Sequence, residues 1–363
     1  MSRCRMPPSF LALARCAVVT LASLAAVSVQ ARMEPLADQE LSDITGQAFI
    51  NLTTDTNAQG ITFSRVNFGL DVNTQLNINK LELGNYGRNG ESVPADISIN
   101  NFALGTVNAN DTINPFLIRN PYLELAYKNN RVVGVRIGFG EAQGFLSGDI
   151  NSFTGNLAID IYGRGSYLAG KIKEAQSSCF FNINCTLADA LGALAGDAVF
   201  KAQAELVCGP SMANCNAGDP DALRALYAGL KDGTVLTIPE NSGIGSSLVS
   251  ILLPLITSQD CKMLGLDTCF NLANYKTLPV GKFDTNTQQF TDTAKGVFIA
   301  MQTENINWRD PQNASNFITA LAGAFMNMPR NADGSGAVTL DFVQALQGAV
   351  RQDTCLGAAT HGC

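Results

Sequence analysis

The stretch Val66-Asn-Phe-Gly-Leu-Asp-Val-Asn-Thr-Gln-Leu-Asn-Ile78 indicates how the N-terminal half of this chain folds. Its apolar residues alternate with glycine and with amide, hydroxyl and carboxyl side chains. A strand with this period of two carries its apolar side chains on one face and its polar side chains on the other. The alternation extends from Phe49 to Gly163. We therefore expect an antiparallel, strand-rich, amphipathic β-sheet in a domain of residues 49–170.

A β-hairpin is expected inside this region. The segments 122–127 and 131–139 both alternate, and Lys128-Asn-Asn130 separates them as a turn. The alternation changes phase near Ser64 and again near Asn79, which predicts bulges or strand breaks. The sheet is therefore expected to be irregular.

The sequence changes character after Gly170, where leucine and alanine recur at helical spacing. Thr186 and Asp189 resemble a capping arrangement for the first of these segments. Helices are expected at 187–202, from Asp219-Pro220 to about Leu230, at 315–327 and at 340–351. The predicted fold class is therefore α+β, with a mainly helical, cysteine-rich domain at 171–363.

Eight of the ten cysteines lie in this C-terminal half and fall into four close pairs. The pairs are Cys179 and Cys185, Cys208 and Cys215, Cys261 and Cys269, and Cys355 and Cys363. An even number of closely spaced cysteines in an exported chain is typical of disulfides. We expect each cysteine to bond its nearest neighbour, which would staple the helical region.

The first 31 residues are interpreted as a secretory signal. Arg3 and Arg5 form a basic start, an apolar run extends from Cys16 to Val29, and small residues precede a cut after Ala31. The apolar run is shorter than the roughly 20 residues of a membrane span. Residues 32–48 then form a short N-terminal motif segment. We therefore expect an exported protein of the cell envelope.

The charge of the chain argues against nucleic acid as a partner. The formal net charge is −7, and removal of Arg3, Arg5 and Arg15 with the signal would bring it to −10. An acidic protein is a poor ligand for phosphate backbones and for bare anionic lipid headgroups.

No catalytic motif is present, so we do not expect an enzyme, a cofactor or a metal centre. A serine hydrolase would need a G-x-S-x-G turn and a histidine, yet His361 is the only histidine and lies near the C-terminus. The segment Asn331–Thr339 resembles the front of a calcium-binding EF-hand loop, but Phe342 stands where its closing glutamate belongs. An ordinary Asp-Gly turn is the favoured interpretation of this segment.

The apolar side of the predicted sheet is the candidate binding site. It could be a core face covered by the C-terminal helices, or a groove for apolar chains. The residues expected to line such a groove are Phe63, Phe68, Leu70, Val72, Leu76, Ile78, Phe102, Leu104, Val135, Ile137 and Phe139. A cavity shared by these residues would favour ligand binding over a role as scaffold.

The segment Leu36-Ala-Asp-Gln-Glu-Leu-Ser-Asp-Ile-Thr-Gly-Gln-Ala-Phe-Ile50 resembles the start of a group of exported proteins of Gram-negative bacteria. The strands Phe68–Val72 and Val135–Gly140 resemble the same group. It includes the alkane uptake protein A family and, more distantly, proteins of pilus systems. The resemblance extends to about residue 165 and supplies no functional residue.

The resemblance implies an envelope protein, placed at the outer membrane, that helps bring long-chain alkanes into the cell. The expected partners are a long-chain hydrocarbon or lipid and the outer membrane, and an inner-membrane partner protein is left open. The periplasm and the cell surface are alternative locations. The alternative function is a surface interaction module, adhesin-like or pilus-associated, in which the strands are only a scaffold.

Overall fold

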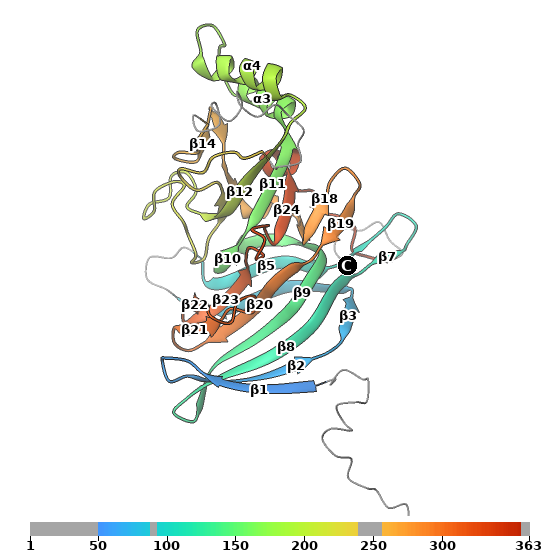
Figure 1. The fold of residues 1–363 in the computed structure, drawn as a ribbon, viewed down its shortest axis with the longest axis vertical. Helices are drawn as coiled ribbons and strands as arrows, with labels where there is room; N and C mark the ends of the chain where they lie inside the picture. Colours follow the sequence, from blue (N-terminus) through green and yellow to red (C-terminus); the bar gives the residue numbers. More distant parts are fainter. Residues whose placement is uncertain (1–49, 88–92, 239–255, 357–363) are drawn as a thin grey trace, which may run out of the picture. The chain divides into compact units, whose positions relative to one another are not determined.

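The longest strand, β9 (Arg131–Ser152), organises the largest sheet because its two halves pair with different neighbours. Its first half lies antiparallel between β8 (Phe116–Lys128) and β20 (Ala294–Gln302). Its second half pairs antiparallel with β5 (Ala95–Leu104) and β17 (Thr277–Val280). Figure 1 shows this long strand curving through the sheet.

The computed structural model describes residues 50–87, 93–238 and 256–356. All of them belong to one unit, which spans residues 48–363. The expected signal sequence and the motif segment lie outside the described residues.

The largest sheet contains 16 strands and continues across residue 170, where a domain boundary was expected. Its main path runs β1-β2-β8-β9-β17-β24-β11-β12-β13-β16, and β3, β4, β5, β10, β20 and β23 pair beside that path. Most pairs are antiparallel, whereas β10 with β23 and β11 with β24 are parallel. The members not yet introduced are β1 (Ile50–Thr56), β2 (Thr62–Phe68), β3 (Asp71–Thr74), β4 (Leu76–Asn85), β10 (Gly155–Leu157), β11 (Ile159–Arg164), β12 (Val199–Val207), β13 (Tyr227–Gly229), β16 (Cys269–Asn271), β23 (Gly323–Met328) and β24 (Val338–Asp341).

Four small two-stranded sheets project from this framework. They are β6 (Thr106–Val107) with β7 (Ile113–Asn114), β14 (Lys262–Met263) with β15 (Leu266–Asp267), β18 (Lys282–Asp284) with β19 (Gln289–Asp292), and β21 (Ile306–Arg309) with β22 (Phe317–Ala320). The hairpin expected around residues 128–130 is confirmed, since β8 and β9 meet at Asn129 and Asn130, both of which have left-handed backbone angles.

The expected α+β fold class is wrong, because the C-terminal part is rich in strands rather than helices. The α-helices among the described residues are three short ones, α3 (Gly165–Glu174), α4 (Ile183–Ala195) and α6 (Phe342–Gln347). Among the residues that the structure describes, one 3-10 turn, η2, spans Leu272–Asn274. None of the described helices is long and apolar enough to cross a membrane.

Two of the four expected helices are not helical, and the other two are shorter than expected. The segment 315–327 forms β22 and most of β23, and the segment from Asp219 to Leu230 consists of bends and isolated bridges before it ends in β13. The expected helix 187–202 stops at Ala195, after which Ala198 and Ala202 are buried in or beside β12. The helix expected at 340–351 is α6, which is shorter because Gly348 ends it. Apolar spacing in short segments does not distinguish a buried strand from a helix.

Three of the four expected disulfides are confirmed. Cys179–Cys185, Cys208–Cys215 and Cys261–Cys269 have Cα–Cα distances of 5.4, 5.9 and 5.0 Å. The fourth expected pair includes Cys363, which lies outside the described residues. Disulfides persist in oxidising compartments, so the three bonds indicate an extracytoplasmic location.

Candidate functional site: an open apolar face of the sheet

Strand β9 has two chemically different faces in its first half. In the segment Val133–Gly140, apolar side chains occupy the odd positions, and glycine and Arg136 occupy the even positions. Successive side chains of a strand point to opposite faces. The even positions Gly134, Arg136 and Gly138 are buried, whereas Ile137 is half exposed. The apolar side of this strand is therefore the more open side.

Aromatic side chains cover the glycine side of β9, which we call the covered face. A Cβ atom at Gly134 would lie 2.6 Å from Ile306 and 2.9 Å from Trp308, both of which belong to the hairpin β21–β22. A Cβ at Gly138 would lie 2.1 Å from the ring of Tyr122. Because glycine has no Cβ atom, these two positions let the rings of Trp308 and Tyr122 pack directly against the backbone of β9.

A buried ionic cluster completes the covered face. Arg136 donates from Nε to Glu124 Oε2 at 2.7 Å and from Nη1 to the carbonyl oxygen of Arg309 at 2.8 Å. Arg65 donates from Nε to the other carboxylate oxygen of Glu124 at 3.1 Å. The guanidinium of Arg136 also lies 4.9 Å from the ring centroid of Trp308. Because the charges are paired inside the fold, this cluster has a structural role.

Tyr122 lies beside this cluster and stays protonated. Burial raises the pKa of the Tyr122 hydroxyl, and the neighbouring guanidinium groups of Arg136 and Arg65 oppose that rise. The covered face therefore holds a neutral phenol against two cations, and the guanidinium of Arg65 lies 4.2 Å from the centre of its ring.

The odd side of β9 continues as one apolar surface over five strands. Residues that pair in an antiparallel sheet point to the same face. One row of such pairs joins Leu52, Val66, Leu123, Ile137 and Ile299 from β1 to β20. We define the open apolar face as Ile50, Leu52, Val66, Phe68, Leu123, Leu125, Val135, Ile137, Phe139, Ile299 and Met301. At its inner end, Phe139 and Ile299 are half buried and also pack against the main hydrophobic core.

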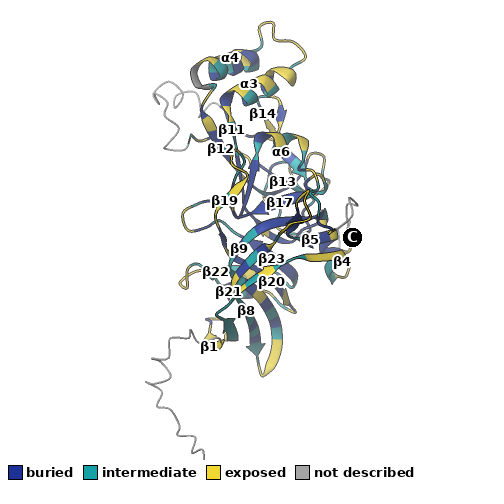
Figure 2. Cartoon of the chain, turned by 90° about the vertical axis from the view of Figure 1, so that its right-hand side faces the viewer, coloured by how far each residue is buried: buried dark blue, intermediate teal, exposed yellow. Residues whose placement is uncertain are grey.

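The exposure of these side chains is unusual for the middle of a sheet. Ile137 is 51% exposed although its strand has neighbours on both sides, and Leu52 on β1 is 72% exposed. Met301 on β20 is 46% exposed. Figure 2 shows buried residues alternating with less buried ones along β8 in the same sheet.

The face is closed on the side of β23. Met326 pairs with Ile299 and is buried, and β23 contacts β4 and β5. A fully buried ion pair holds these elements together, in which Arg224 Nε lies 2.9 Å from Asp96 Oδ1. The other oxygen of Asp96 accepts a hydrogen bond from the backbone N–H of Ala324 at 2.9 Å. The face therefore opens toward β1 and ends under the β4–β5 hairpin.

Charged residues bound the face along the strands. Beyond Phe139, the next odd position of β9 is Glu141, which pairs in register with Arg119 and Lys295. Arg119 Nη1 donates to Glu141 Oε2 at 3.1 Å. The apolar surface thus has a polar rim at one end.

Four residues predicted from the sequence lie on the open apolar face, namely Phe68, Val135, Ile137 and Phe139. The other seven do not share it, and the predicted cavity is not formed by the set as a whole. Phe63 is buried on the covered face, with its ring centroid 5.3 Å from that of Trp308. The remaining six lie in three places. The main core includes or contacts Val72, Phe102 and Leu104. The surface of β4 carries Leu76 and Ile78, and the link between β2 and β3 carries the half-buried Leu70.

More than half of the residues of the open apolar face were not predicted from the sequence. The missed residues come from neighbouring strands whose pairing register was unknown. Apolar and other residues do alternate in β2, β8 and β20, but this alternation does not indicate which face of the sheet is covered by other elements. They are Ile50, Leu52, Val66, Leu123, Leu125, Ile299 and Met301.

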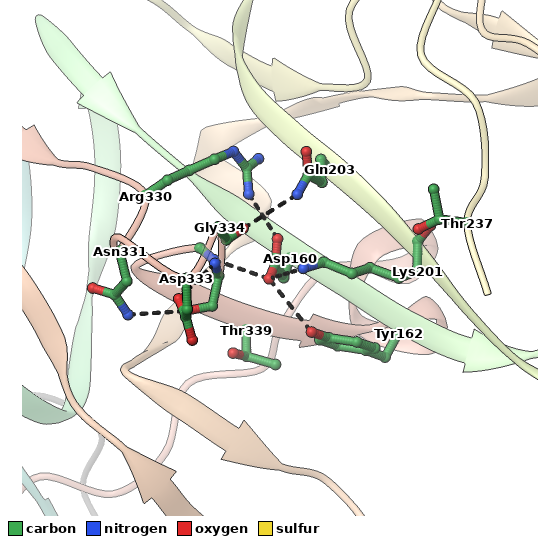
Figure 3. A network of polar contacts seen from close by, with 12 residues as sticks. Asp160, Tyr162, Lys201, Gln203, Thr237, Arg330, Asn331, Asp333, Gly334 and Thr339 are labelled. Carbon is green, nitrogen blue, oxygen red and sulfur yellow. Dashed lines mark hydrogen bonds and ion pairs between the residues drawn. The ribbon is translucent and has the colours of Figure 1, made fainter. Parts of the chain in front are cut away.

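A second polar cluster surrounds Asp160 of β11 (Figure 3). Oδ1 of the buried carboxylate accepts a hydrogen bond from Arg330 Nη1 at 2.8 Å. Oδ2 lies 2.7 Å from Lys201 Nζ and accepts a hydrogen bond from the N–H of Gly336 at 2.9 Å. The Tyr162 hydroxyl donates to the same Oδ2 at 3.4 Å, and burial together with the Asp160 charge raises its pKa. These donors saturate Asp160, which therefore links β11, β12 and the turn before β24.

The segment 331–339, considered as a calcium loop, is a turn followed by strand β24 and not by a helix. Asp333 Oδ1 accepts from the N–H of Ser335 at 2.9 Å and from its hydroxyl at 2.6 Å. Asn331 Nδ2 donates to the same hydroxyl at 2.9 Å. The side chains that resemble calcium ligands thus bind one another and fix the turn.

The larger clefts among the described residues have mixed polar and apolar linings. One cleft of about 420 Å³ is lined by Tyr162, Lys282 and Asp284 together with threonine and apolar residues. Within the described ranges, no group of three or more histidine, cysteine, aspartate or glutamate side chains could hold a metal ion. The open apolar face is therefore the most distinctive candidate site.

Comparison with known proteins gives one match. A family model described as a family of unknown function (DUF6160) matches residues 11–113, which is less than a third of the chain. No curated protein and no solved structure matches. The match includes residues 11–31 of the expected signal and strands β1 to β6, and nothing in it links the chain to alkane uptake proteins.

Proposed function

We propose that this protein binds apolar molecules on its open apolar face and transfers them within the cell envelope. The observation that supports the proposal is the half-exposed Ile137 in an interior strand, inside a continuous apolar surface that spans β1 to β20. Burial of apolar area contributes about 25 cal/mol per Å², so a long apolar chain could bind here without polar contacts.

Long-chain alkanes and acyl chains are the ligand class that this surface suits. The open apolar face carries no charge, and its charged rim begins at Glu141 and Arg119. An alkane offers no hydrogen bonds, so it needs area and shape from its carrier. The disulfides support an extracytoplasmic site of action, and within it we propose the outer membrane, as the resemblance implies.

A displacement titration tests the proposal on the protein itself. Purified protein is loaded with the apolar fluorophore N-phenyl-1-naphthylamine, which hexadecane then displaces. A ligand would bury the exposed half of the Ile137 side chain, which contributes about 0.8–1.5 kcal/mol, so Ile137→Asn should lower the affinity by roughly four- to tenfold. The matched control is Ile113→Asn on β7, because Ile113 is 43% exposed but lies outside the face.

Equal affinities of the two variants would contradict the proposal. Alkane uptake is the finer part of it and has its own test, which is growth on hexadecane of a strain that lacks the gene. Normal growth and uptake would refute alkane transport while leaving the binding result intact.

A second candidate function rests on the edge strand β1. All seven of its residues are exposed, and it ends the path of the largest sheet. Exposed edge strands can pair with another chain. A surface interaction module would then join β1 of two copies, and light scattering should show a dimer that Thr53→Lys abolishes. A monomer at all concentrations would exclude it.

A further inference from the structure

The loop that joins α3 to α4 presents three large apolar side chains to solvent. Phe180 is 81% exposed, Phe181 is 93% exposed and Ile183 is 69% exposed. The two phenyl rings lie edge to face with centroids 4.3 Å apart. Such a cluster is costly in water, so its exposure calls for a function.

The loop is held in this form by covalent and polar contacts. The Cys179–Cys185 disulfide closes it at its base. Asn182 accepts from the N–H of Asn184 at 2.9 Å and donates to Gln176 Oε1 at 3.1 Å. Gln176 in turn donates to the carbonyl oxygen of Leu264 at 2.9 Å. The phenyl rings are therefore presented by a fixed loop.

The backbone also directs Phe181 outward. Its φ is +54°, in the left-handed region that an aromatic residue seldom adopts. A conformation of this kind persists only where surrounding contacts impose it, and such strain is common at binding sites. The loop therefore accepts backbone strain at Phe181, which is the most exposed of the three apolar residues.

The charge pattern around the loop fits a lipid surface. No charged residue occurs between Glu174 and Asp189, although the chain as a whole is acidic. The nearest cations along the sequence are paired, Lys171 with Glu174 and Lys173 with Asp189, and Lys262 is paired with Asp267 on the β14–β15 hairpin that Gln176 contacts. The serine, asparagine and threonine residues of the loop place no negative charge at the contact, so the phenyl rings can partition into the interface of a bilayer whose headgroups carry no net charge.

We propose that residues Phe180, Phe181 and Ile183, the apolar tip, insert into the surface of a lipid bilayer and dock the protein on a membrane. A protruding tip fits a deformable acyl layer and needs no preformed pocket. This inference does not depend on the ligand proposed for the open apolar face, because the two surfaces share no residue.

Tryptophan fluorescence gives a direct test. The single tryptophan of the chain, Trp308, is fully buried, so wild-type emission serves as a background. In Phe181→Trp, vesicles of phosphatidylcholine, whose headgroups carry no net charge, should shift the emission to the blue, and lipids with brominated acyl chains should quench it. The emission of wild-type Trp308 should change in neither experiment.

Vesicle sedimentation gives the matched comparison. The double variant Phe180→Ser, Phe181→Ser should lose about tenfold or more in vesicle partitioning. The control Phe317→Ser should keep it, because Phe317 is a phenylalanine that is 46% exposed on β22. Unshifted Phe181→Trp emission, or equal partitioning of the double variant and the wild type, would overturn the proposal and leave a protein groove as the occupant of the tip.

Discussion

At the scale of single residues, glycine determines which side of β9 is covered. Gly138→Ala would push a Cβ atom into the buried ring of Tyr122, at 2.1 Å from its nearest atom. We expect the free energy of unfolding to fall by about 1–3 kcal/mol in urea titrations, because the core around the ring is overpacked. Gly170→Ala is the control. Its Cβ would meet nothing within 4 Å, and alanine favours helix α3 by roughly 1 kcal/mol. If Gly138→Ala left the free energy of unfolding unchanged, the ring of Tyr122 would be able to move away.

Asp333 predicts a pH dependence of stability. The hydroxyl and N–H of Ser335 donate to its carboxylate and hold the pKa below the usual 3.8. A lowered pKa in the folded state means that the stabilisation is present above pH 4 and is lost as the pH falls through the folded pKa. Asp333→Ala should therefore lower the melting temperature at pH 7, and the difference from the wild type should shrink as the pH falls below 4. A pH-independent difference would assign the stabilisation to something other than the carboxylate charge.

The disulfide pairing was predictable at this scale, because cysteines six to eight positions apart can meet whatever the fold between them. The sequence could not predict which face of the sheet the side chains of Phe63 and Ile137 occupy. Both belong to alternating strands, yet Phe63 meets Trp308, which is distant in sequence, and Ile137 meets solvent. Which face a hairpin such as β21–β22 covers depends on contacts that alternation does not encode.

At the scale of elements, one ion pair fastens the β4–β5 hairpin to β23. Arg224→Met would leave Asp96 charged and buried, and removing one partner of such a pair costs about 3–5 kcal/mol. Hydrogen exchange should become faster in β4, β5 and β23. The control is Arg164→Met, since Arg164 pairs with fully exposed Asp197 and should contribute less than about 1 kcal/mol. Unchanged exchange in the hairpin would mean that backbone pairing alone holds it.

The helix predictions failed at this scale for a physical reason. In the segment 315–327, leucine, alanine and phenylalanine recur at spacings that suit one face of a helix. In the fold, however, β23 is buried between β10 and β20, and a strand buried on both faces loses its alternation. The segment 342–347 became helix α6 because Asp341 and Gln344 form a capping box, which the sequence does contain.

At the scale of the whole molecule, the protein exposes apolar residues on two unrelated surfaces. The open apolar face is built by strand pairing and contains no cysteine, whereas the apolar tip depends on a disulfide-closed loop. Exposed apolar area is costly in both places, and each surface suits a different partner: a broad sheet face for an apolar chain, a protruding tip for a bilayer. A carrier at a membrane would need both.

A mutation in one surface should therefore reduce the binding activity of that surface and leave the activity of the other unchanged. Ile137→Asn is expected to weaken hexadecane binding, measured without vesicles, and to leave vesicle partitioning unchanged. The double variant Cys179→Ser, Cys185→Ser should do the reverse, because the loop that presents Phe181 loses its closure while the sheet has no cysteine in its β1–β9 part. A combined variant should lose both activities by the product of the single effects, as expected for independent sites. If either single variant reduced both activities to the same degree, the two surfaces would instead act as one binding site.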